Sequence, residues 1–131
     1  MIENWNKFNE NLVNDQLDDI LNIAYDEGYH ISLHGNTEIG NIKKIIHITN
    51  GTEEICKEED LLDIEKFITI MKDVSNRVVQ LFTHVEFKTS AIIHGTSQTE
   101  QIDIRSVESM RNYKAIRCFS MFIYDRSQNR L

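Results

Sequence analysis

The chain has 131 residues, of which 40 % are hydrophobic and 27 % are charged, and its formal net charge at pH 7 is −7. This length fits one domain with a single hydrophobic core, and the apolar content excludes an intrinsically disordered chain. No apolar run approaches the roughly 20 residues of a membrane-spanning helix, and the first residues lack the basic-then-apolar order of a signal peptide. We therefore expect a cytoplasmic protein without a membrane partner, folded as one domain over residues 1–131.

The charge is divided unevenly along the chain. Residues 1–65 contain fifteen acidic residues and four lysines, whereas residues 66–131 contain six acidic and ten basic residues. Net charge far from zero influences association with other macromolecules more than it influences the fold. The division predicts one strongly acidic face that meets another macromolecule.

The first segment has apolar residues at helical spacing. They are Trp5, Phe8, Leu12, Val13, Leu17, Ile20, Leu21 and Ala24. The pattern predicts two helical pieces that end near residue 27, with Asn11 or Asn14 as the cap of the second piece and Gly28 as its terminator. Two β-branched runs follow, at residues 29–34 and 42–49, and the turn-rich segment between them indicates a β-hairpin.

Helical spacing returns from Glu58 and predicts a helix over residues 59–82. Phe67, Met71, Val74 and Val78 would face the sheet, and the acidic residues of the first turns suit the positive end of the helix dipole. Strands are then expected at residues 85–94, 101–105 and 115–124. The last strand is apolar on both faces, which is typical of a central strand.

This order predicts a single α+β domain with the sequence α-β-β-α-β-β-β, in which two helices pack on an antiparallel sheet of four or five strands. The element order is similar to that of roadblock-type and other profilin-like modules over most of the chain. Those modules serve mainly as protein-binding and dimerising units, and they end in a closing helix that this chain lacks. The resemblance implies a protein-binding role.

One pattern favours an enzyme instead. The segments HISL and HITN, which begin at His30 and His47, resemble the paired H-x-[ST]-x motifs of 2H phosphoesterases. The resemblance implies His30 and His47 as acid and base, and Ser32 and Thr49 as the hydroxyls that hold the phosphate. A hairpin turn centred near residues 38–39 would place His30 opposite His47. The family separates its motifs over two lobes, whereas these lie 17 residues apart, so the phosphoesterase is the alternative hypothesis.

A nucleic-acid-binding module is the third hypothesis. Basic residues gather near the C-terminus beside Tyr113, Phe119 and Tyr124, and such a mixture can follow phosphates and stack on bases. The basic residues are Arg105, Arg111, Lys114, Arg117, Arg126 and Arg130. The overall negative charge repels a polyanion, so nucleic acid is the weaker partner class.

No cofactor or metal is expected. Cys56 and Cys118 are the only cysteines, and their separation fits no zinc-ligand motif. His30 and His34 would lie roughly 13 Å apart on a strand, which is too far for one ion. Common nucleotide-binding, hydrolase and metalloprotease motifs are also missing from the sequence.

The leading hypothesis is therefore a small acidic protein without catalytic activity that binds a protein partner with a basic surface. An inhibitor, an immunity-like or phage anti-defence protein, and an adaptor all fit this description. Any of these could act as a homodimer. The candidate partner-binding residues are Asp15, Asp18, Asp19, Asp26, Glu53, Glu54, Glu58 and Glu59.

Overall fold

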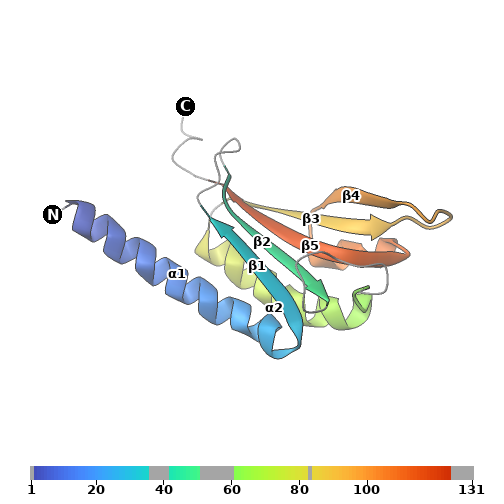
Figure 1. Cartoon of the computed structure of the whole chain (residues 1–131), viewed down its shortest axis with the longest axis horizontal. Helices are drawn as coiled ribbons and strands as arrows, with labels where there is room; N and C mark the ends of the chain where they lie inside the picture. The colour runs from blue at the N-terminus through green and yellow to red at the C-terminus, as the bar shows by residue number, and fades with distance from the viewer. Residues whose placement is uncertain (1, 36–41, 51–60, 83, 125–131) are drawn as a thin grey trace.

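A computed structural model describes residues 2–35, 42–50, 61–82 and 84–124, with side chains from Leu12 onward. These residues form two α-helices, five strands and one 3₁₀ helix (Figure 1). In chain order they are α1 (Ile2–Asp26), β1 (Tyr29–Gly35), β2 (Ile42–Asn50), α2 (Ile64–Leu81), β3 (Val85–Ile92), β4 (Thr99–Ile104), η1 (Val107–Asn112) and β5 (Ala115–Tyr124). The predicted α+β class and the order α-β-β-α-β-β-β are confirmed. Neither of the two α-helices is both long and apolar enough, over the described residues, to cross a bilayer.

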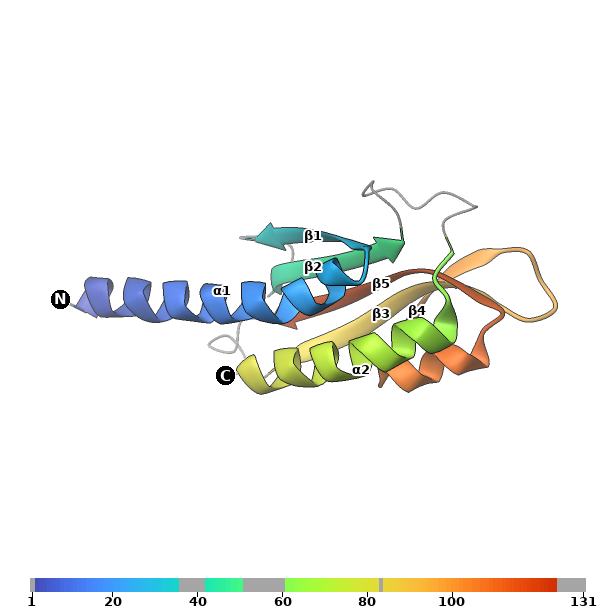
Figure 2. The same cartoon turned by 90° about the horizontal axis from the view of Figure 1, so that it is seen from below.

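The five strands form one antiparallel sheet in the order β1-β2-β5-β3-β4. The most apolar strand, β5, lies in the middle, as its two apolar faces indicate. The helices all pack on one side of the sheet (Figure 2). Among the described strands, β1 and β4 are therefore the two edges, and β1 lies beside α1.

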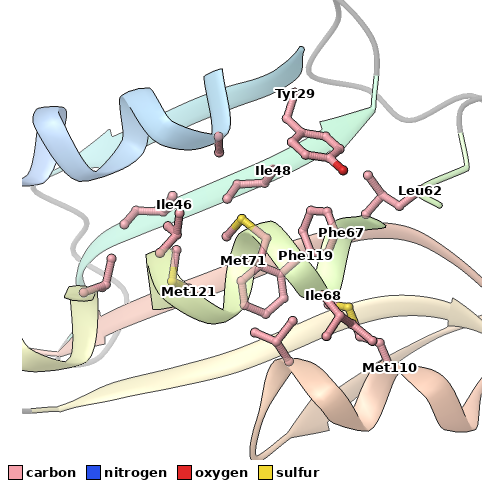
Figure 3. Packing of buried hydrophobic residues seen from close by; sticks show 14 of the residues in the cluster. Tyr29, Ile46, Ile48, Leu62, Phe67, Ile68, Met71, Met110, Phe119 and Met121 are labelled. Atoms are coloured by element: carbon pink, nitrogen blue, oxygen red, sulfur yellow. The ribbon is translucent and has the colours of Figure 1, made fainter. Parts of the chain in front are cut away.

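The core lies between the helices and this side of the sheet. The fully buried ring of Phe67 from α2 contacts Tyr29 of β1 and Phe119 of β5, with ring centroids 5.2 and 5.7 Å apart and edge-to-face geometry (Figure 3). The other α2 residues expected to face the sheet, Met71, Val74 and Val78, are also fully buried. The predicted orientation of α2 is confirmed.

The first segment is one continuous helix rather than the two predicted pieces. Asn14 does not cap a second piece, because its Oδ1 accepts a 2.7 Å hydrogen bond from Nζ of Lys44 on β2. Leu12 was expected on the apolar stripe but is 49 % exposed. Gly28 ends the turn after the helix with φ of 95°, a left-handed conformation that suits glycine.

The second helix begins at Ile64, and the prediction that it already includes residues 61 and 62 is wrong. The backbone N–H of Leu62 donates to the carbonyl oxygen of Ile116 at 2.8 Å, so this residue bridges to β5 instead. Asp63 then caps the helix, with Oδ1 accepting from the N–H of Lys66. The acidic residues at 58–60, expected in the first turns, lie outside the described residues.

The C-terminal half differs from the prediction at its boundaries. β3 ends two residues early, at Ile92, and β4 begins two residues early, at Thr99. The 3₁₀ helix η1 was not predicted, because six residues are too few to show a helical period. It covers one end of the core with Val107 and Met110, both of which are buried.

Substitution Met71→Asp tests the position of α2. Met71 has no exposed surface, so the carboxylate would be buried without a counter-charge, and we expect a loss of about 4 kcal/mol or more in the free energy of unfolding. Asn76→Asp adds the same charge at an exposed position of α2 and should change stability by less than about 0.5 kcal/mol. Equal chemical denaturation curves for the two variants would contradict this packing.

A second prediction concerns Tyr29, whose hydroxyl is buried and has no hydrogen-bond partner among the described residues. An unsatisfied buried hydroxyl is destabilising, so Tyr29→Phe should keep stability or raise it by about 1 kcal/mol. Tyr124→Phe is the matched control, because the Tyr124 hydroxyl donates to Oε1 of Glu86 at 2.8 Å and its removal should not stabilise. A clear loss of stability in Tyr29→Phe, measured by urea denaturation, would contradict the assignment.

The same hydroxyl has a consequence at high pH. Burial raises the pKa of Tyr29, and the negative charges of Asp63 and Glu27 raise it further. The folded state holds this proton more tightly than the unfolded state. The contribution of Tyr29 to the free energy of unfolding is therefore fully present below about pH 10 and is lost as pH rises above it. The loss between pH 10 and 11 should be shallower in Tyr29→Phe. A loss as steep as that of the wild type would show that Tyr29 titrates as in the unfolded chain.

Candidate functional site

Four of the predicted partner-binding residues form one surface on α1. Asp15, Asp18, Asp19 and Asp26 are all exposed. None of the four forms an ion pair or hydrogen bond with another described residue, and we call them the α1 acidic surface. The other four predicted residues, Glu53, Glu54, Glu58 and Glu59, lie outside the described residues.

Four acidic side chains on α2, β4 and η1 form ion pairs within the molecule. The carboxylate of Glu65 accepts from Nε of Arg111 at 2.9 Å, although the two residues are 46 positions apart, and this bond raises the pKa of the arginine. Ion pairs also join Asp73 to Arg77, Glu108 to Lys72, and Asp103 to Lys88. Basic residues of the second half thus neutralise these four acids, whereas the α1 acidic surface has no ion-pair partner among the described residues.

Two grooves flank the α1 acidic surface. One, of about 440 Å³, lies between α1 and the edge strand β1 and is lined by Asp18, Leu21, Asn22, Tyr25, Ile31 and Leu33. The other, of about 360 Å³, lies between α1 and α2 and contains Asp19 and Arg77. Tyr25 and Leu33 are 66 % and 43 % exposed, so the first groove offers apolar area beside negative charge.

The histidines of the hairpin do not face each other as predicted. His30 pairs with Thr49, and His47 pairs with Ser32, so the register differs by two residues from the predicted pairing of His30 with His47. A shift of two leaves every side chain on the same face of the sheet, and the alternation of apolar residues therefore cannot distinguish the two registers. The two histidines are diagonal neighbours on the face opposite the helices.

Strand pairing places a polar row on that face. Ser32, His47, Ser120, Lys88 and Asp103 are successive partners across the five strands. Nδ1 of His47 lies 2.7 Å from Oγ of Ser120, and Nε2 of His30 lies 3.4 Å from Oγ of Ser32. Sequence reasoning missed Ser120, because only the pairing of β2 with β5 brings it to His47.

This arrangement differs from two histidines that flank a phosphodiester. Thr49 has no exposed surface, so its hydroxyl cannot contact a substrate, and His47 is already bound to Ser120. We expect the wild type to hydrolyse bis(4-nitrophenyl) phosphate no faster than buffer. Turnover that disappears in both His30→Ala and His47→Ala, with unchanged melting temperatures, would establish the alternative hypothesis instead.

Two of the three aromatic residues expected beside the C-terminal basic residues are engaged within the fold. Phe119 is fully buried in the core, and the Tyr124 hydroxyl is bound to Glu86. Arg117 donates through Nε to Oγ1 of Thr99 at 2.7 Å, and Arg111 is paired with Glu65 as described above. Arg126 and Arg130 lie outside the described residues. Phe119 is therefore unavailable for base stacking, and Tyr113 is the half-buried aromatic residue left beside Lys114.

Cys118 is a free, buried thiol, and no group of three or more His, Cys, Asp or Glu side chains in the described ranges is placed to hold a metal ion. Comparison with protein-family models, curated proteins and solved structures finds no match to this chain. The surfaces of the molecule are therefore what indicates its function.

Proposed function

We propose that this protein acts by binding a protein partner with a basic surface through the α1 acidic surface, without catalysing a reaction. The observation that carries the proposal is the contrast among its acidic residues. The ion-paired acids lie on α2, η1 and β4, whereas Asp15, Asp18, Asp19 and Asp26 are exposed and form no ion pair with another described residue.

The size of this surface suits a protein contact. At a rise of 1.5 Å per residue, Asp15 and Asp26 lie about 17 Å apart along the helix. A typical interface buries about 800 Å² on each partner, so one such patch would include this whole stretch. The chain's net charge of −7 adds long-range attraction toward a basic surface and accelerates encounter.

Masking of a basic surface is the mode of action that follows from this chemistry. An inhibitor, an immunity-like or anti-defence protein, or an adaptor would use it, with the cytoplasm as the expected location. A homodimer through the same surface is disfavoured, because it would bring two unneutralised acidic rows together. The phosphoesterase and nucleic-acid hypotheses lack a comparable structural observation.

Charge reversal tests the proposal. We expect a variant with Lys at Asp15, Asp18, Asp19 and Asp26 to remain folded, since exposed charges contribute little to stability. It should lose the partner that the wild type captures from cell extract. The control variant carries Lys at Glu86, Glu100, Asp103 and Glu108, which are exposed and lie on other elements, and it has the same net charge. It should keep the partner.

Salt provides an independent measurement of the same interaction. Raising the salt concentration from 0.1 M to 1 M shortens the Debye length from about 10 Å to about 3 Å, so the association rate of the wild type with its purified partner should fall. Retention of the partner by both charge variants at wild-type affinity would contradict the proposed function.

A further inference from the structure

The edge strand β1 lacks the residues and the bulge that normally prevent an exposed strand from pairing. Its sequence YHISLHG contains no proline and no acidic, lysine or arginine residue. Its pairing with β2 runs from Tyr29 to Gly35 without a bulge. Natural proteins protect edge strands with charges, prolines, bulges or short length. β1 has seven residues and none of these protections.

The opposite edge provides an internal comparison. β4 carries Glu100 and Asp103, both exposed, and Asp103 forms an ion pair with Lys88 of β3. Charges of this kind discourage the addition of another strand. The two edges of one sheet thus differ, and the unprotected edge is the one beside the α1 acidic surface.

The groove between α1 and β1 lies where side chains of an added strand would point. Ile31 and Leu33 project from β1 toward α1, where they meet Leu21 and Tyr25. A strand added outside β1 would direct every second side chain to the same side, over this apolar floor. Tyr25 and Leu33, two of the four exposed large hydrophobic residues among the described side chains, would then be covered.

The charge of the groove between α1 and β1 determines which kind of added strand it would bind. Asp18 lines the groove, Asp15 lies one helical turn before it, and the described residues of β1 and of the groove include no lysine or arginine. A second copy pairing through β1 would bring two acidic α1 helices side by side and would supply no cation. An extended segment with aliphatic and basic residues satisfies both the apolar floor and the carboxylates.

We infer that the partner contributes an extended, basic and aliphatic segment, which adds to the sheet as a sixth strand along β1 and fills the groove between α1 and β1. This inference rests on the proposed function and assigns the partner's binding mode. Backbone hydrogen bonds along β1 would provide affinity, and the groove with Asp18 would provide selectivity.

The test titrates the isotope-labelled full chain with a capped peptide of alternating lysine and valine, about nine residues long so that it covers β1. We expect saturable NMR shifts in the amides of β1 and in the α1 residues of the groove. Two control peptides separate the contributions. One replaces lysine by glutamate, and the other is N-methylated on two consecutive central residues, which blocks hydrogen bonding on both of its edges. Each should bind at least about tenfold more weakly.

Matched protein variants locate the site. The double variant Tyr25→Ser with Leu33→Ser removes the apolar floor and should weaken the peptide at least about tenfold. Leu12→Ser with Val79→Ser, at two other exposed hydrophobic positions, should leave the affinity unchanged. Asp18→Lys should weaken binding more than Asp19→Lys, because Asp19 lies in the groove on the α2 side.

Three results would overturn the inference: absence of lysine–valine peptide binding, equal affinity of the N-methylated peptide, or shifts in α1 without shifts in β1. A monomer–dimer equilibrium that Leu33→Ser abolishes would do so too, because a second copy would then occupy the edge. The charge-reversal experiment tests the proposed function independently of the peptide titration. If its α1 variant loses the captured partner while the peptide fails these tests, the acidic surface binds, but not by strand addition.

Discussion

The insertion of Phe67 between Tyr29 and Phe119 is the contact on which the rest of the arrangement depends. It joins α2 to the edge strand β1 and to the central strand β5 at once, and it lies entirely on one side of the sheet. Because the hydrophobic core of the described residues is on this side, α1 turns Leu17, Leu21 and Ala24 inward. Its aspartates are consequently left on the outer surface, next to the edge of the sheet.

Ion pairs within the fold neutralise some of the acidic residues that make the charge of the sequence uneven. Arg111 reaches back to Glu65, and Lys88 binds Asp103, so part of the basic second half is neutralised by acids within the fold. These exposed pairs contribute little to stability. Their main effect is on the electrostatic field, since Asp15, Asp18, Asp19 and Asp26 stay exposed and form no ion pair with another described residue.

Much of the fold follows from sequence periodicity, because the helices and strands are amphipathic and long enough for their periods to be recognised. The burial of Met71, Val74 and Val78 is of this kind. The start of α2 differs from the prediction because Leu61 fits the apolar period, whereas the next residue, Leu62, bridges to Ile116. The hairpin register differs from the prediction because a shift of two residues keeps the same apolar side chains on the same face, so their alternation does not specify the register.

The candidate site was predictable only in its composition. The aspartates of α1 are visible in the sequence, but which acids are neutralised depends on contacts such as Glu65 with Arg111, 46 positions apart. The hydrogen bond between His47 and Ser120 spans 73 positions and likewise requires the sheet order. The groove beside β1 exists only because α1 packs next to an edge strand, which no local pattern specifies.

Carboxylate footprinting with a carbodiimide, in the free protein and in the complex with its captured partner, tests the central claim most directly. Modification of Asp15, Asp18, Asp19 and Asp26 should slow in the complex, whereas Glu86, Glu100 and Glu108 should react at the rate of the free protein. If the α1 aspartates keep their free rates while the carboxylates of β3, β4 and η1 become protected, the partner binds elsewhere and the account is wrong.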